Sequence, residues 1–166
     1  MPDEDLFALD LVTPERVLVS DRVKEVVLRD GVGDVTFLAG HTPLIGSVEP
    51  GLVRLTVESG DVVRIASHGG FVQVEYGVEL ATPDEEPRRG TRVTMLLGVA
   101  ELAEEIDVER ARVALEVAEA RLADLGSSGR TSEGDAVDPE VAEAEGERLR
   151  AQTRLDVVQE PSTTGA

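Results

Sequence analysis

The hydrophobic period changes once along this chain, near residue 100, and that change constrains the fold more than any other feature. Up to about residue 97, apolar and polar residues alternate, which is the period of half-buried β-strands. From about residue 101, Ala, Glu, Arg and Leu dominate, and apolar residues recur at steps of three and four, as on one helix face. The sequence therefore predicts an α+β protein: a β domain over residues 1–100, a helical domain over residues 101–160, and a disordered tail over residues 161–166.

Turn residues divide the β region into short segments rich in Val, Leu and Ile. Asp30-Gly31 and Glu58-Ser59-Gly60-Asp61 predict hairpin turns, since glycine tolerates the positive φ that such turns require. Pro50-Gly51 predicts a type II turn. We expect about ten short antiparallel strands in two sheets that bury their apolar faces against each other, an N-terminal β-sandwich. The clearest segments are residues 16–19, 22–28, 34–38, 52–57, 62–66, 71–74 and 92–97.

The helical region predicts two antiparallel helices, a C-terminal hairpin. Asp107 is the expected N-cap of the first helix and Gly126 its end. Asp138 caps the second helix, Pro139 opens it, and it runs to about Val158. The seam between them is thin and rich in Ala, so we expect the second helix to come away easily. The apolar face of the first helix consists of Ala111, Leu115, Ala118, Leu122 and Leu125.

Composition excludes several classes of function. The formal net charge is −18 and aromatic residues make up 2% of the chain, so neither a phosphate backbone nor stacked bases would be bound, and we expect no nucleic-acid partner. There is no Cys, which excludes disulfides and thiolate chemistry. No segment has the roughly 18 apolar residues of a membrane helix. The acidic N-terminus predicts no signal peptide.

No catalytic constellation can be assembled from the sequence. The chain has two His, and no Ser-His-Asp arrangement or paired carboxylates accompany them, so we expect neither an active site nor a metal site. His41 lies in a Gly-His-Thr-Pro turn and is interpreted as a hydrogen-bonded turn residue, as is His68. Gly69-Gly70 lacks the Lys-Ser/Thr of a phosphate loop and predicts a close backbone approach instead. A stand-alone acidic adaptor and a small hydrolase stay open as alternatives.

Five motifs, in this order and spacing, resemble the epsilon subunits of F-type ATP synthases across residues 8–158. The resemblance implies a ten-stranded β-sandwich that grips the gamma subunit and the ring of c subunits, so that the chain is a non-catalytic central-stalk (rotor) subunit. It also implies a helical hairpin that lies folded or extends along gamma, near alpha and beta, to inhibit ATP hydrolysis. The expected location is the cytoplasmic face of the plasma membrane, peripheral to it through the complex. The motifs are residues 12–16 (VTPER), 40–44 (GHTPL), 50–54 (PGLVR), 69–74 (GGFVQV) and 106–111 (IDVERA).

The resemblance also implies candidate site residues. No cofactor is required, but the folded hairpin of some family members binds ATP as a regulator. Here that site corresponds to residues of the fifth motif and to two Arg residues one turn apart on the second helix: Ile106, Asp107, Arg110, Ala111, Arg150 and Arg154. A helix cap and surface ion pairs are the alternative interpretation. Partner contact is expected at the loop residues Leu38, His41, Pro43, Leu44 and Ile45, for which packing inside the sandwich is the alternative.

Three features depart from the family pattern. Residues 76–90 form a long insertion, which we expect to be an extended hairpin. The second helix has Arg148, Arg150 and Arg154 but no Lys, and acidic residues surround them, which argues against inhibition by an extended helix. Val117 stands where the family has a further basic residue of the nucleotide site. The acidic residues Glu101, Glu104 and Glu105 are expected to be solvated or to attract a basic partner surface.

Overall fold

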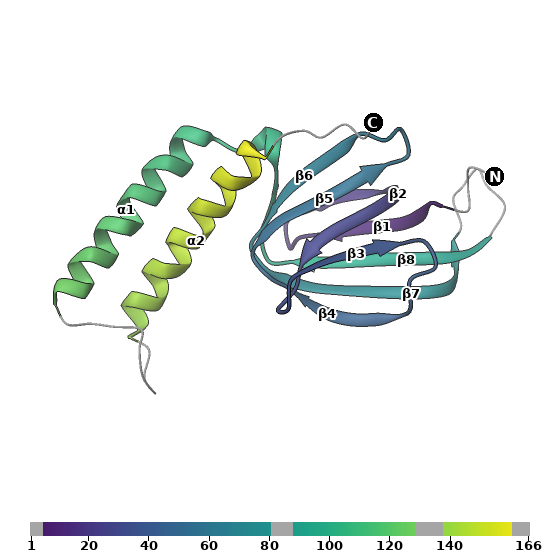
Figure 1. Ribbon diagram of the computed structural model, residues 1–166, viewed down its shortest axis with the longest axis horizontal. Helices are drawn as coiled ribbons and strands as arrows, with labels where there is room; N and C mark the ends of the chain where they lie inside the picture. Colours follow the sequence, from purple (N-terminus) through teal and green to yellow (C-terminus); the bar gives the residue numbers. More distant parts are fainter. Residues whose placement is uncertain (1–4, 81–87, 129–137, 161–166) are drawn as a thin grey trace.

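The computed structural model describes residues 5–80, 88–128 and 138–160. In this part of the chain, strands and helices follow one another in the predicted order, with nine strands before the helices (Figure 1). The strands are β1 (Phe7–Val12), β2 (Val17–Arg29), β3 (Asp34–Leu38), β4 (Leu44–Val48), β5 (Gly51–Val57), β6 (Val62–Ser67), β7 (Gly70–Leu80), β8 (Arg88–Leu97) and β9 (Ala100–Leu102). A 3-10 helix η1 (Ala103–Glu105) leads to α1 (Val108–Ser127) and α2 (Pro139–Gln159).

The strands form a two-layered sandwich in which β2 belongs to both layers. The first layer has the order β4-β7-β8-β1-β2, and the second consists of β3, β2, β5, β6 and β9. The first half of β2 pairs with β1, and its second half pairs with β5 and β3. The register shifts between Val23 and Glu25, where β2 passes from one layer to the other. The sandwich fold is therefore confirmed, with a shared strand at the turn between its layers.

Two details of the predicted sandwich were wrong. The described residues contain nine strands rather than ten, because the segments 16–19 and 22–28 belong to one continuous strand. Ser20 and Asp21 between them lie opposite β1, and Ser20 Oγ donates a hydrogen bond to Asp10 Oδ1 at 2.7 Å. In addition, the sandwich is not wholly antiparallel, since β1 pairs with β8 in parallel.

Alternation along the strands directs one side chain of every two into a common core. Residues of both layers meet there with almost no exposed surface, and the largest are Phe7, Phe37, Leu9, Leu11, Leu28, Leu55, Ile65 and Met95. Burying a side chain of this size stabilises the fold by about 1.5–3 kcal/mol. The core thus holds the two layers in a fixed relation without Trp or disulfides.

Three of the four predicted turns and close approaches are confirmed, although Gly31 does not adopt the positive φ expected in its turn. Asp30 Oδ1 accepts hydrogen bonds from the amides of Val32 and Gly33 in the β2–β3 turn, and Gly60 has φ +93° in the β5–β6 turn. At Gly70 the backbone of β8 comes so close that a Cβ would lie 2.2 Å from the Leu96 carbonyl oxygen. The type II turn at Pro50-Gly51 was wrong, because Gly51 has no positive φ and begins β5.

The inserted segment lengthens the β7–β8 hairpin. Pairing between these strands continues to Leu80 and Arg88, past a bulge between Tyr76 and Val78 where Gly77 has φ +72°. Residues 81–87, the predicted tip, lie outside the described residues, as do most of the predicted link 126–134 and the tail 161–166. The described part of the insertion is therefore an ordered continuation of two core strands.

The two helices form the predicted antiparallel hairpin. Asp107 caps α1 by accepting a hydrogen bond from the Arg110 amide at 3.0 Å, and Asp138 caps α2 through the Glu140 amide. Helix α1 ends at Ser127 rather than at Gly126, which lies within its last turn. The seam consists mainly of small residues, which allow the helices to approach closely. Its buried members are Ala111, Ala118 and Leu125 on α1 and Val141, Ala144, Ala151 and Leu155 on α2.

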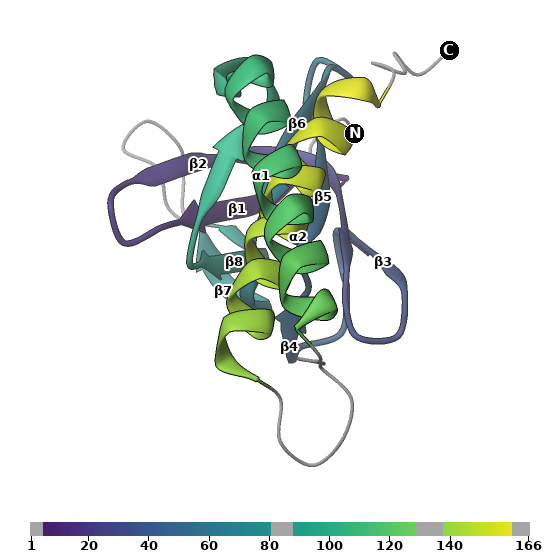
Figure 2. The same ribbon diagram turned by 90° about the vertical axis from the view of Figure 1, so that its left-hand side faces the viewer.

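Only the C-terminal end of α2 is seated on the sandwich. Figure 1 shows α2 between α1 and the strands, with the far ends of both helices projecting away, and Figure 2 shows the hairpin in front of the strands. Val157 and Val158 pack against Leu52 of β5 and Ala66 of β6, which are paired neighbours on the outer face of the second layer. Arg64 donates hydrogen bonds to the carbonyl oxygens of Val157 and Glu160, which satisfies the last carbonyls of α2. We call this contact the dock.

Candidate functional site

A cavity of about 360 Å³ lies where the last strand, the 3-10 helix and both α-helices meet. Its walls come from segments far apart in the sequence, so it exists only while the hairpin is folded on the sandwich. The lining residues are Glu101, Glu105, Asp107, Arg110, Ala111, Ala114 and Arg154. Four of the six predicted nucleotide-site residues are among them.

The other two predicted residues lie elsewhere. Ile106 is buried beneath the cavity, in the same apolar cluster as Val157 and Ala66, and is therefore part of the dock. Arg150 is exposed on α2 and does not line the cavity, although it lies one turn before Arg154. The motif 106–111 thus supplies one residue to the apolar cluster of the dock and three residues to the lining of the cavity.

Three of the charged side chains that line this cavity already form ion pairs: Glu101, Glu105 and Arg154. Arg154 Nε donates to Glu101 Oε2 at 2.5 Å, and Arg16 from the β1–β2 loop donates to Glu105 Oε2 at 2.5 Å. The hydrogen bond from Arg16 lowers the pKa of the Glu105 carboxyl below its usual range. Arg110 makes no ion pair with any residue that the structure describes, so its guanidinium is available to an anion.

The lining contains three carboxylates and two guanidiniums, so an anionic ligand would meet both attractive and repulsive charges. A polyanion would be met first by Arg110, and by Arg154 only after Glu101 releases it. An anionic group that contacts Arg154 would therefore have to displace the ion pair with Glu101. The described lining residues of the cavity include no Ser, Thr, Cys or Lys that could act as a nucleophile beside a base.

Glu101, Glu104 and Glu105 were expected to be solvated or to attract a basic partner surface. Glu104 is exposed as expected, Glu105 is also exposed and Glu101 is partly buried, but the carboxylates of Glu101 and Glu105 have partners within the chain. Both face the cavity and hold Arg side chains from distant segments. Their position directly before the motif 106–111 was the one signal that could have placed them there, because η1 turns the chain back toward α2.

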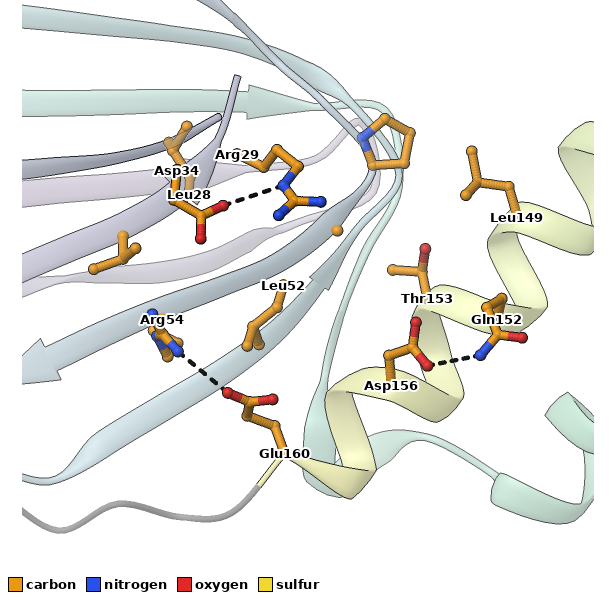
Figure 3. A pocket seen from close by; sticks show the side chains of 13 residues that line it. Leu28, Arg29, Asp34, Leu52, Arg54, Leu149, Gln152, Thr153, Asp156 and Glu160 are labelled. Carbon is orange, nitrogen blue, oxygen red and sulfur yellow. Dashed lines mark hydrogen bonds and ion pairs between the residues drawn. The ribbon is translucent and has the colours of Figure 1, made fainter. Parts of the chain in front are cut away.

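A second cavity of about 350 Å³ lies between α2 and the strands β2 and β5 (Figure 3). Leu52 and Leu149 supply its apolar walls, while Arg54 bridges to Glu160 at 3.2 Å across the gap. Figure 3 also shows the Arg29–Asp34 pair on the sandwich side, 3.1 Å apart. The cavity separates the middle of α2 from the sandwich and confines the dock to the end of the helix.

The predicted partner-contact residues divide into two groups. Leu38, Pro43 and Ile45 are exposed, the last at 78%, so they are available to another protein. Leu44 packs against the core, as the alternative interpretation had it. His41 is half-buried, its Nδ1 lies 2.8 Å from the Thr42 carbonyl oxygen, and its ring meets Phe37 edge-on. The interpretation of His41 as a hydrogen-bonded turn residue is confirmed.

Strand pairing extends the exposed apolar surface well beyond these loop residues. Phe71, Leu96, Val12 and Val17 lie side by side across β7, β8, β1 and β2 on the outer face of the first layer. Phe71, Leu96 and Val17 are each more than half exposed. Ile45 on the edge strand β4 is diagonal to Phe71 on the same face. We call these five residues the apolar row; only Ile45 was predicted, because the others become neighbours through pairing alone.

Both halves of the chain match described protein families. Residues 6–79 match the family described as "ATP synthase, Delta/Epsilon chain, beta-sandwich domain". Residues 104–159 match the "long alpha-helix domain" of the same chain. The first match stops within β7, a few residues into the inserted segment 76–90.

Curated relatives carry the same description. The chain is 42% identical over 119 residues to the ATP synthase epsilon chain of Carboxydothermus hydrogenoformans, covering 72% of this chain and 78% of the relative. It is 40% identical over 147 residues to that of Thermobifida fusca, covering 86% and 89%. Among solved structures, a chain of the Euglena gracilis mitochondrial ATP synthase (OSCP, F1 and c-ring) has the same fold, with a TM-score of 0.59, 22% identity, and coverage of 93% and 78%.

Proposed function

The chain belongs to the delta/epsilon chain family of ATP synthases, and from that premise we propose that it is the non-catalytic central-stalk subunit that couples the c-ring to gamma. The matches to both family domains carry this proposal. The sandwich transmits torque, and the helical hairpin regulates ATP hydrolysis. Its partners are gamma, the c-ring and, through the hairpin, the alpha and beta subunits. The adaptor and hydrolase alternatives lack comparable support.

The apolar row supports a firm contact with gamma. A subunit that transmits torque needs a rigid interface with an apolar centre. The row lies on strands whose opposite faces are the core, so it cannot move relative to the sandwich. Leu38, His41 and Pro43 precede Ile45 of the row in the chain, at the β3–β4 loop and its edge. This loop is held to β8, since the Gly40 amide donates to Thr91 Oγ1 at 2.8 Å. Leu44 supports the loop from below.

The cavity between hairpin and sandwich is the proposed regulatory ATP site. Arg110 and Arg154 would meet the phosphates, Arg150 would join them from one turn away, and Asp107 and Ala111 would form the wall, above Ile106. Because bound ATP would touch both α1 and α2, it would favour the folded hairpin over the extended one. No cofactor is needed for the coupling role itself.

Calorimetric titration of the full chain with ATP tests this site. Heat of binding is expected for the parent and should vanish in the Arg150→Ala and Arg154→Ala variants. Arg148→Ala is the matched control, because Arg148 is exposed on the same helix away from the cavity. Absence of heat in the parent, or equal loss in the control, would exclude the site without touching the coupling role.

The proposed location is peripheral, at the cytoplasmic face of the plasma membrane, through attachment to the complex. Neither described helix is long and apolar enough to cross a membrane. Inverted membrane vesicles stripped of this subunit provide the test of function. Adding the chain is expected to restore proton-driven ATP synthesis, while the isolated chain turns over no ATP. Failure of restoration, or hydrolysis by the chain alone, would contradict the proposal.

A further inference from the structure

His68 lies at the seam between the sandwich and α2, directly after β6, and neither the fold nor the proposed function accounts for it. Its side chain is only 4% exposed. Nε2 lies 3.4 Å from Glu101 Oε2, and Nδ1 is buried and meets no hydrogen-bond partner among the described residues. A buried polar atom without a hydrogen-bond partner destabilises the folded state. A histidine whose only role is to fill space would therefore be unfavourable at this position.

Glu101 connects this imidazole to the hairpin. The oxygen that faces His68 Nε2 is the same Oε2 that accepts the hydrogen bond of Arg154 Nε from α2. The charged groups that act on His68 are Glu101 on β9 and Arg150 and Arg154 on α2. One carboxylate thus stands between an imidazole on the sandwich and a cationic helix face.

We propose that His68, Glu101 and Arg154 form a proton-sensitive latch that holds α2 on the sandwich while His68 is neutral and releases it when His68 takes up a proton. In the neutral ring, Nε2 carries the proton toward Glu101 and Nδ1 is bare. A second proton would have to enter at Nδ1, where it finds no acceptor. The protonated ring would also be a second cation beside Glu101 Oε2, the oxygen that accepts the hydrogen bond of Arg154.

The direction of the pH effect follows from linkage. Burial lowers the pKa of His68 below its ordinary value, and the positive charge of Arg154 lowers it further, although Glu101 acts in the opposite sense. Release of α2 removes Arg150 and Arg154 and raises this pKa, so the released state binds the proton more tightly. Docking is therefore unaffected above the ordinary His pKa of about 6.5 and weakens below it, by up to about tenfold per pH unit for one proton.

The latch goes beyond the proposed function, and its test needs neither a partner subunit nor a nucleotide. The chain has no Cys, so spin labels at Glu58→Cys in the β5–β6 turn and Ala142→Cys on α2 report the distance between sandwich and hairpin. Between pH 7.5 and 5.5 the docked population of the parent is expected to fall. It should stay constant in His68→Gln, whose amide can still donate to Glu101 but does not titrate.

His41→Gln is the matched control. His41 is the other histidine of the chain, and it lies in the β3–β4 loop, outside the dock. It should follow the parent. A parent that stays docked at pH 5.5, or a His68→Gln variant that retains the pH effect, would overturn the latch. So would a His68→Gln variant already released at pH 7.5, because His68 would then be a packing residue only.

A second measurement separates the latch from any effect on folding. The pKa of His68 can be followed by NMR in the full chain, with the resonance assigned by its loss in His68→Gln. Arg154→Gln is expected to raise this pKa toward the ordinary value, since it removes a nearby positive charge. An unchanged pKa in Arg154→Gln would show that α2 and His68 are not coupled and would refute the proposal.

Discussion

Val157→Ala is predicted to release the hairpin while the sandwich stays folded. Val157 is fully buried, and its cluster contains Ala66 of the sandwich and Ile106 but no residue of the far α1–α2 seam. The variant loses two methyl groups, at about 0.8 kcal/mol each, and leaves a small cavity, so the dock weakens by about 2 kcal/mol. At about 1.4 kcal/mol per tenfold, the ratio of docked to released molecules falls roughly 30-fold.

The distance between spin labels at Glu58→Cys and Ala142→Cys measures this ratio directly. Val113→Ala on α1 is the matched control, because it makes the same change of helix propensity at a side chain that is 55% exposed. It should alter the ratio by less than about threefold, as surface substitutions generally do. A Val157→Ala variant as docked as the parent, or a control that releases α2 equally, would refute the assignment of the dock to this cluster.

Two further substitutions test the fold itself. Gly70→Ala should lower the free energy of unfolding by more than about 2 kcal/mol, since its Cβ would overlap the backbone of β8 at Leu96. Gly46→Ala is the control and should lower it far less, because its Cβ would meet only side chains, the nearest at 3.6 Å. Urea unfolding measures both. Asp107→Ala removes the N-cap of α1 and should lower the free energy of unfolding by about 1 kcal/mol. Asp124→Ala should be close to neutral, because the Asp124 carboxylate makes no hydrogen bond to any residue that the structure describes. Equal effects within either pair would contradict the geometry described.

Local signals predicted the elements of this chain well. The turns at Asp30 and Gly60, the caps Asp107 and Asp138, and the helix seam all depend on residues close in sequence, whose types restrict φ or supply hydrogen bonds on the spot. The interpretation of Gly69-Gly70 as a close approach also held, since few other roles require two adjacent glycines before a strand. Such features need no knowledge of the rest of the fold.

Features that depend on pairing between distant segments were missed. Ser20 and Asp21 look like turn residues, yet they continue β2 because β1 satisfies their backbone and side chains. The parallel pairing of β1 with β8 joins segments some 80 residues apart, which no local pattern encodes. For the same reason, the sequence did not predict that His68 and Arg154 are the partners of Glu101, and it predicted the apolar row only at Ile45.

Binding to the purified gamma subunit of the same organism tests the proposed rotor role most directly. Isothermal titration of the full chain is expected to give a 1:1 complex, and Phe71→Ser and Leu96→Ser in the apolar row should each weaken it about tenfold or more. Val117→Ser, an equally exposed apolar site on α1, should bind as the parent does. A chain that stays monomeric beside gamma, or row variants that bind unchanged, would contradict the role proposed for the sandwich.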